Sequence, residues 1–83
     1  KLKSDNKNVF LEIQGHTDST GSDAGNERLG QERAEAVRRF LSDQGIALNR
    51  MATISYGAAK PVAPNNTREG RAQNRRVAIM VLA

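Results

Sequence analysis

The succession of a strand pattern, a helical pattern and a second strand pattern constrains the fold of this chain most. Val9–Gln14 alternates between apolar and polar residues, which predicts a strand with one buried face. A loop rich in Gly, Ser and Asp follows over Gly15–Asn26, then a predicted helix over Glu27–Gln44 and a second strand over Met51–Tyr56. A connection that contains a helix is long enough for a crossover, so we expect the two strands to run parallel.

The predicted helix has recognisable ends and one apolar side. Asn26 is a suitable N-cap, and Gly45 is a suitable residue to end the helix. At helical spacing one stripe collects the apolar residues Leu29, Ala36, Val37, Phe40 and Leu41. We expect this stripe, Phe40 included, to pack in the core.

The second half of the chain predicts a loop, a short helix and a third strand. Gly57–Asn66 is a loop that contains both prolines, and Thr67–Gln73 is a short helix capped by its first residue or by the residue before it. Arg76–Leu82 has apolar residues on both faces, which is typical of a central strand. Because one helix and one short helix cover a three-stranded sheet poorly, we expect further sheet or helix partners upstream of Lys1.

The composition fits one small folded domain over residues 1–83. Hydrophobic residues make up 37% of the chain and charged residues 27%, which is typical of a globular protein. The longest apolar run, Val77–Ala83, is far shorter than the about 20 residues that a membrane span needs. The absence of cysteine excludes a disulfide framework and a thiolate metal site. The net charge of +4 suits an anionic partner, whether nucleic acid, anionic lipid or a carboxylate-rich polymer.

Arg33 is the most informative residue of the helix. It lies one turn after Leu29 and one turn before Val37, and therefore in the middle of the apolar stripe. A guanidinium in this position must either reach water or meet an anion. A ligand carboxylate and a structural ion pair with a nearby carboxylate are equally good interpretations from residue type alone.

Asp18 follows the first strand directly, where loops build sites on a rigid scaffold. The helix returns over the sheet, so Asp18 and Arg33 are expected to face a common pocket near the first helical turns. Asp18 would bind an ammonium group and Arg33 a carboxylate, and the helix N-terminus near Asn26 would favour the carboxylate further. The alternative, which residue type favours, is an aspartate that caps a turn of its own backbone.

The sequence offers little for catalysis. His16 is the single histidine, and no carboxylates stand at metal-ligand spacing around it. A hydrolase that uses His16 and Asp18 would lack a nucleophile. A structural histidine at the end of a strand is therefore the better interpretation of His16. We therefore predict no catalytic residue, no metal and no cofactor.

Asn74, Arg75 and Arg76 put two adjacent cations before the third strand. A solvated loop is the simpler interpretation, and a small basic nucleic-acid-binding module is the alternative function that these residues suggest. Such a module needs aromatic residues for base stacking. The aromatic residues of this chain are only Phe10, Phe40 and Tyr56.

Ordered motifs are distributed along the whole chain. In the first half these are Gly15-His16-Thr17-Asp18, Gly21, Asn26-Glu27-Arg28-Leu29, Arg33-Ala34 and Val37. In the second half they are Gly45-Ile46, Arg50, Tyr56-Gly57, Pro61, Asn65, Thr67, Gly70-Arg71 and Asn74-Arg75-Arg76-Val77. Together these motifs resemble the OmpA-like C-terminal domain family. The resemblance runs from Val9 to Leu82, and its many ordered matches make it specific.

The resemblance implies an α/β two-layer sandwich of the βαβαβ type, with a mixed β-sheet and helices packed on one face. Family domains begin with another strand and helix before Val9, so we expect the domain to be N-terminally truncated here, with Lys1-Leu2-Lys3 as the tail of that helix. Two positions depart from the family. Gly30 stands where the family has Ser, which is expected to loosen the first helical turn, and Ser55 stands where the family often has Gly.

The resemblance also implies the function. It implies non-covalent binding of peptidoglycan through the diaminopimelate residue of the stem peptide, in the periplasm, as an anchor of an envelope protein associated with the outer membrane. Membrane attachment would come from other parts of the parent, which could be a porin-like barrel, a lipoprotein or a motor stator. Nucleic acid is not an expected partner. The implied ligand-binding residues are Asp18 and Arg33 on diaminopimelate, Asn74 and Arg75 as a second group, and Thr17, Gly21, Asn26 and Leu29 as the lining of the pocket.

Overall fold

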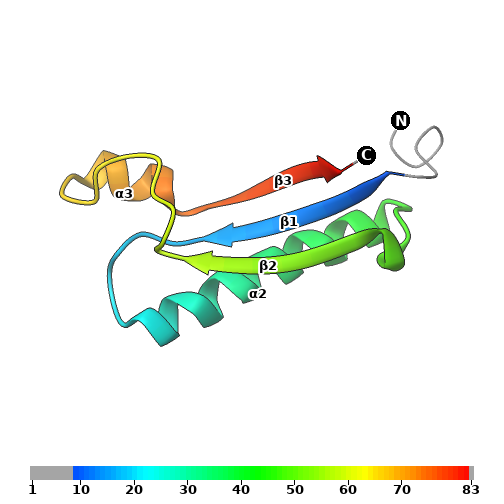
Figure 1. Cartoon of the computed structure of the whole chain (residues 1–83), viewed down its shortest axis with the longest axis horizontal. Helices are drawn as coiled ribbons and strands as arrows, with labels where there is room; N and C mark the ends of the chain where they lie inside the picture. The colour runs from blue at the N-terminus through cyan, green and yellow to red at the C-terminus, as the bar shows by residue number, and fades with distance from the viewer. Residues whose placement is uncertain (1–8, 83) are drawn as a thin grey trace.

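A computed structural model describes residues 9–82 and contains the elements that the sequence predicts, in the predicted order (Figure 1). The expectation for Lys1-Leu2-Lys3 lies outside the described residues. The elements are strand β1 (Phe10–His16), helix α2 (Asp23–Asp43), the 3-10 turn η1 (Leu48–Arg50), strand β2 (Met51–Gly57), helix α3 (Arg68–Asn74) and strand β3 (Arg76–Leu82).

The three strands form one mixed sheet in the order β2-β1-β3. β1 pairs with β2 in parallel, as the crossover predicts, and with β3 antiparallel, so that Ile13 is a register partner of both Thr53 and Ile79. The prediction that β3 is a central strand is wrong for the sheet that residues 9–82 form. β3 lies at its edge, and Val81 is 58% exposed. Apolar residues on both faces are a local property of a strand, and they do not reveal whether other strands pair with both of its edges.

Helix α2 packs on one face of the sheet, along β1 and β2 (Figure 1). The core between the two layers contains Leu11, Ile13, Ala34 and Met51. Gly15 sets how close the layers come, because a Cβ built on it would overlap the Gly30 carbonyl. This architecture confirms the α/β class with a mixed sheet, while α3 lies beyond the end of the sheet at the start of β3 (Figure 1).

Helix α2 begins earlier than predicted. Ser22 is its N-cap, and the Ser22 hydroxyl accepts a hydrogen bond from the Gly25 N–H at 3.0 Å. The prediction that Asn26 is the cap is wrong, because Asn26 lies one turn inside the helix and is buried. Both residues are good caps by type, and only the path of the loop decided between them.

The other predicted helix ends are confirmed. Gly45 follows α2 with a positive φ of 104°, and the Ile46 N–H donates to the Leu41 carbonyl at 3.1 Å. This pattern is a Schellman end, which favours glycine at the left-handed position. Thr67 caps α3, where its hydroxyl accepts from the Gly70 N–H at 2.9 Å.

The predicted apolar stripe of α2 coincides only in part with its buried side, because Val37 and Leu41 pack against the core and other members of the stripe do not. Phe40 is 61% exposed and Leu29 is also exposed, whereas Gly30 and Ala34 are buried against the sheet. The prediction that Phe40 belongs to the core is therefore wrong for this structure. Because α2 approaches the strands closely at Gly15, its contact side takes small residues near this point, whereas Val37 and Leu41 pack against the core farther along the helix.

The two departures from the family pattern face each other across the interface of helix and sheet. A Cβ built on Gly30 would overlap the Ser55 hydroxyl oxygen. The contact has room for one small side chain. In this chain it is Ser55 on β2, opposite Gly30 on α2, whereas the family pattern has Ser on the helix and Gly on the strand. Gly30 lies well inside α2, which begins at Asp23, so the expectation that it loosens the first turn is wrong.

Candidate ligand-binding site at the end of strand β1

Asp18 lies two residues beyond β1, and its carboxylate is occupied on both oxygens. Oδ1 accepts the backbone N–H of Thr20 at 2.8 Å, and Oδ2 lies 2.7 Å from Nη1 of Arg75. The residue is buried. The bond to Thr20 is the turn-capping role that residue type favours, whereas the ion pair to Arg75 joins residues far apart in the sequence.

These donors keep Asp18 ionised. The Thr20 N–H first, and then the Arg75 guanidinium, lower the pKa of Asp18 from 3.8 to about 2. Burial works in the opposite direction and is the smaller effect. The side chain is thus a carboxylate at neutral pH, which is the form that a cationic group binds.

Arg33 is half-buried and reaches the same end of β1. Its Nη1 donates to the carbonyl oxygen of His16 at 3.3 Å. The guanidinium therefore lies beside the backbone of a residue that precedes Asp18 by two positions. Within residues 9–82 no carboxylate forms an ion pair with Arg33. The alternative that Arg33 serves a structural ion pair therefore finds no partner in this part of the chain.

Asn74 is fully buried, and its amide is used by the loop before α3. Oδ1 accepts from the N–H groups of Val62 and Ala63 at 2.8 and 3.1 Å. Nδ2 donates to the Ala63 carbonyl at 3.0 Å and to Oδ1 of Asn65 at 2.8 Å. With both amide atoms engaged, Asn74 holds the loop in place and thereby sets the position of the neighbouring Arg75.

Asn65 joins the β1–α2 loop, which carries Asp18, to helix α3, which Arg75 follows directly. Its Oδ1 accepts the Ser19 N–H at 3.3 Å, and its carbonyl accepts from Nη1 of Arg71 at 3.0 Å. Sequence reasoning used Asn65 only as a family match and did not assign it to the site. The only feature that could have drawn attention to Asn65 was a polar amide side chain in a loop with two prolines. That feature does not predict a hydrogen bond to Ser19.

The predicted lining residues lie around the β1–α2 loop. Thr17 is buried and donates through its hydroxyl to the Asp18 carbonyl at 2.9 Å. Gly21 has a φ of 90°, a left-handed conformation that favours glycine. A Cβ there would lie 3.9 Å from Oδ1 of Asn26, so these two residues are neighbours. Leu29 is exposed on α2, one turn before Arg33.

His16 lies on the face of the sheet opposite α2, because Gly15 faces the helix and side chains alternate along a strand. Its ring stacks on Tyr56 at 5.4 Å between centroids, and Nε2 is 3.2 Å from Oε1 of Gln14. Burial lowers the pKa of His16, as do the charges of Arg76 and Lys60. Neutral and enclosed, the ring fits the structural role that the sequence favours. Residues 9–82 contain no group of three side chains that could hold a metal ion.

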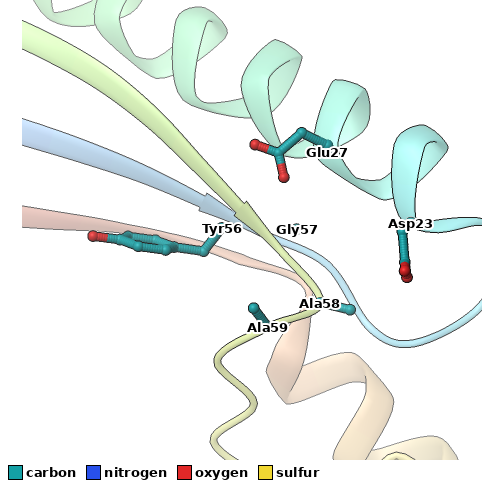
Figure 2. A pocket seen from close by; sticks show the side chains of 6 residues that line it. All are labelled: Asp23, Glu27, Tyr56, Gly57, Ala58 and Ala59. Atoms are coloured by element: carbon teal, nitrogen blue, oxygen red, sulfur yellow. The ribbon is translucent and has the colours of Figure 1, made fainter.

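A pocket of about 330 Å³ lies between the N-terminal part of α2 and the end of β2 (Figure 2). Figure 2 shows Asp23 and Glu27 extending from α2 next to Gly57 and Ala58. Neither Asp18 nor Arg33 lines it, and its charged lining groups are both carboxylates. A carboxylate-bearing ligand would be repelled there, so the pocket is not the predicted site.

Comparison with known proteins identifies the family. The model of the OmpA family matches residues 1–75. Outer membrane porin F of Pseudomonas fluorescens is 48% identical over 73 residues, which are 88% of this chain and 22% of the porin. The peptidoglycan-binding protein ArfA of Mycobacterium tuberculosis is 46% identical over 69 residues, which are 83% of this chain and 21% of ArfA. The chain thus spans about a fifth of these relatives.

The fold has a close match among solved structures. The peptidoglycan-associated lipoprotein of Burkholderia pseudomallei superimposes with a TM-score of 0.86 at 43% identity, over 89% of this chain and 63% of the lipoprotein chain. Sequence and structure agree over most of the chain, and the resemblance that the motifs predicted is confirmed. The chain belongs to the OmpA family.

Proposed function

We propose that this domain binds peptidoglycan non-covalently through the diaminopimelate residue of the stem peptide, and so anchors an envelope protein to the cell wall. The observation that carries the proposal is the pair of charges at the end of β1. Asp18 is an ionised carboxylate, and the guanidinium of Arg33 lies beside the same stretch of backbone without a carboxylate partner among residues 9–82. Relatives named for peptidoglycan binding or association support the choice of polymer.

The end of the diaminopimelate side chain carries an ammonium group and a carboxylate on one carbon. Asp18 would bind the ammonium group and Arg33 the carboxylate, each through charge-assisted hydrogen bonds. A neutral sugar offers no such pair of charges, and a phosphate offers only one sign. The charge pattern therefore favours the peptide part of peptidoglycan over its glycan strands.

The remaining predicted residues would shape the site around this pair. Thr17, Gly21 and Asn26 would line the pocket from the β1–α2 loop, and Leu29 would offer its exposed side chain to the aliphatic part of the ligand. Arg75 would supply a second cation. Asn74 would act by holding Arg75, since its own amide is already bonded.

The proposed setting is the periplasm, where the parent protein would be held by parts outside this chain. In residues 9–82 no helix combines the length and the apolar character needed to cross a bilayer. The proposed role is binding without turnover, because the function needs only a stable complex. Segments similar to this domain occur in proteins as different as a porin and ArfA, which supports the role of an anchor that can be combined with different partners in one chain.

Calorimetric titration with the tripeptide L-Ala-γ-D-Glu-meso-diaminopimelate tests the proposal. The protein is expected to bind, and Asp18→Asn and Arg33→Gln are each expected to weaken binding at least about tenfold, because each removes one charge-assisted contact. The control Arg28→Gln removes an exposed charge from α2 and should bind like the parent. Circular dichroism melts confirm that each variant is folded.

The opposite results are equally informative. If the folded protein gives no heat with this peptide, but binds nucleic acid with an affinity that falls steeply as salt rises, the domain is a nucleic-acid module and not an anchor. If the peptide binds and Arg33→Gln has no effect, the diaminopimelate carboxylate is held elsewhere and the assignment of the site is wrong.

A further inference from the structure

The free site already holds a cation on its carboxylate. Nη1 of Arg75 lies 2.7 Å from Oδ2 of Asp18, and the Thr20 N–H occupies Oδ1. The Asp18 side chain is 10% exposed and the Arg75 side chain 42%. An incoming ammonium group therefore meets Arg75 before it can reach Asp18.

The two donors on Asp18 differ in how easily they can leave. Thr20 donates from the backbone of the same turn and is fixed by the course of the chain. Arg75 follows α3 directly, and its half-exposed guanidinium keeps further N–H groups free to bind another oxygen. An ion pair that is partly exposed is weak, because water solvates both partners well once they separate.

We propose that Arg75 is an exchangeable counter-ion: the ligand's ammonium group replaces it on Asp18, and the released guanidinium then binds a second carboxylate of the same ligand. This inference rests on the proposed function and narrows its ligand class. The site contains two cations, Arg33 and Arg75, and one anion, Asp18. Its complement is one ammonium group with two carboxylates.

The diaminopimelate residue at the end of a stem peptide has this set of charges. The side-chain end carries the ammonium group with its carboxylate, for Asp18 and Arg33, and the chain terminus carries a free carboxylate, for Arg75. Conversion of the terminal carboxylate to an amide leaves the displaced Arg75 without an anion on diaminopimelate. The γ-linked D-Glu also has a free α-carboxylate, so the test uses peptides in which that group is an amide. The exchange therefore predicts that the domain prefers stem peptides in which the chain-terminal carboxylate of diaminopimelate is free.

The test compares two peptides on three proteins by calorimetry. The peptides are L-Ala-D-isoglutaminyl-meso-diaminopimelate, in which the α-carboxylate of D-Glu is an amide, and the same tripeptide with its terminal carboxylate amidated as well. The protein is expected to bind the acid about threefold to fivefold more tightly than the amide. In Arg75→Gln this preference should vanish, and the amide should bind about threefold more tightly than it binds the parent protein, because no cation competes for Asp18.

Two control variants separate exchange from other effects. Arg68→Gln removes a charge from α3, the helix that precedes Arg75, without touching Asp18, and should leave both affinities unchanged. Arg75→Lys keeps a cation beside Asp18 and should keep the parent's preference for the acid. Folding of each variant is checked by its thermal melt.

Several results would overturn the inference. Equal weakening of both peptides by Arg75→Gln would make Arg75 a fixed ligand contact and not an exchangeable one. Unchanged affinities in Arg75→Gln would remove Arg75 from the site, and an Arg75→Lys variant that behaves like Arg75→Gln would exclude competition between cations. If neither peptide binds the parent or Arg75→Gln, the proposed function itself fails.

Discussion

At the scale of single residues, Asp18 shows how neighbours fix a charge. Its folded-state pKa of about 2 lies below the ordinary 3.8, so the folded state binds the proton more weakly than the unfolded state. The stabilisation is therefore fully present above the ordinary value and is lost as the pH falls through about 2. At neutral pH the carboxylate is ready for a cationic ligand.

This balance predicts a measurable titration. In a carboxyl-detected NMR titration the Asp18 midpoint should lie near 2, and Arg75→Gln should raise it while leaving it below 3.8, because the Thr20 N–H, the larger cause, remains. The control Arg68→Gln, which removes a charge from α3 without touching Asp18, should leave the Asp18 midpoint unchanged. An unchanged midpoint in Arg75→Gln would show that the ion pair to Asp18 does not form in solution.

Asn74 is the residue whose loss should cost most stability around the site. Asn74→Ala removes four hydrogen bonds and leaves the Val62 and Ala63 N–H groups without their acceptor. We expect a loss of about 2–3 kcal/mol in the free energy of unfolding, measured by urea denaturation. The exposed neighbour Gln73→Ala is the control, and equal stability of the two variants would contradict a role of Asn74 in holding the loop.

At the scale of elements, the contact between α2 and β2 decides which side chains fit. Gly30 and Ser55 face each other at a spacing that leaves room for one small side chain, here on the strand. Ser55 Oγ also accepts the Gly57 N–H at 3.2 Å, which helps to shape the end of β2. The pair therefore behaves as one unit, although its members belong to different elements.

A double-mutant cycle tests this coupling. Gly30→Ser alone should destabilise the fold by about 1–3 kcal/mol through overlap with Ser55, and Ser55→Gly in the same chain should recover part of that loss. Recovery should be incomplete, because the Gly15 carbonyl oxygen also lies 3.0 Å from the added Cβ. Ala36→Ser, on the exposed side of α2, is the control, and strictly additive losses would disprove the coupling.

At the scale of the whole molecule, the site exists because three chain segments end or begin at one end of the sheet (Figure 1). Parallel β1 and β2 both stop there, and antiparallel β3 starts there. Asp18 follows β1 and Arg75 precedes β3, so the pairing of these strands brings two distant residues to a contact of 2.7 Å. Helix α2 begins at the same end and carries Arg33 back toward it.

The sequence alone determined the local structure and the chemistry of single positions. Periodicity predicted the order of strands and helices, because a side-chain repeat follows directly from backbone geometry. The placement of Asp18 after a strand and of Arg33 among apolar residues pointed to opposite charges in one region, and the ordered motifs pointed to the family before any contact was known.

Only the tertiary structure decided how these parts meet. The edge position of β3, the exposure of Phe40 and the N-cap at Ser22 depend on packing distances and loop paths that no local pattern contains. The occupation of Asp18 by Arg75 follows from strand pairing, since it joins residues that are neighbours in space and not in sequence. Local periodicity is a property of adjacent residues, whereas a site between loops is a property of the whole fold.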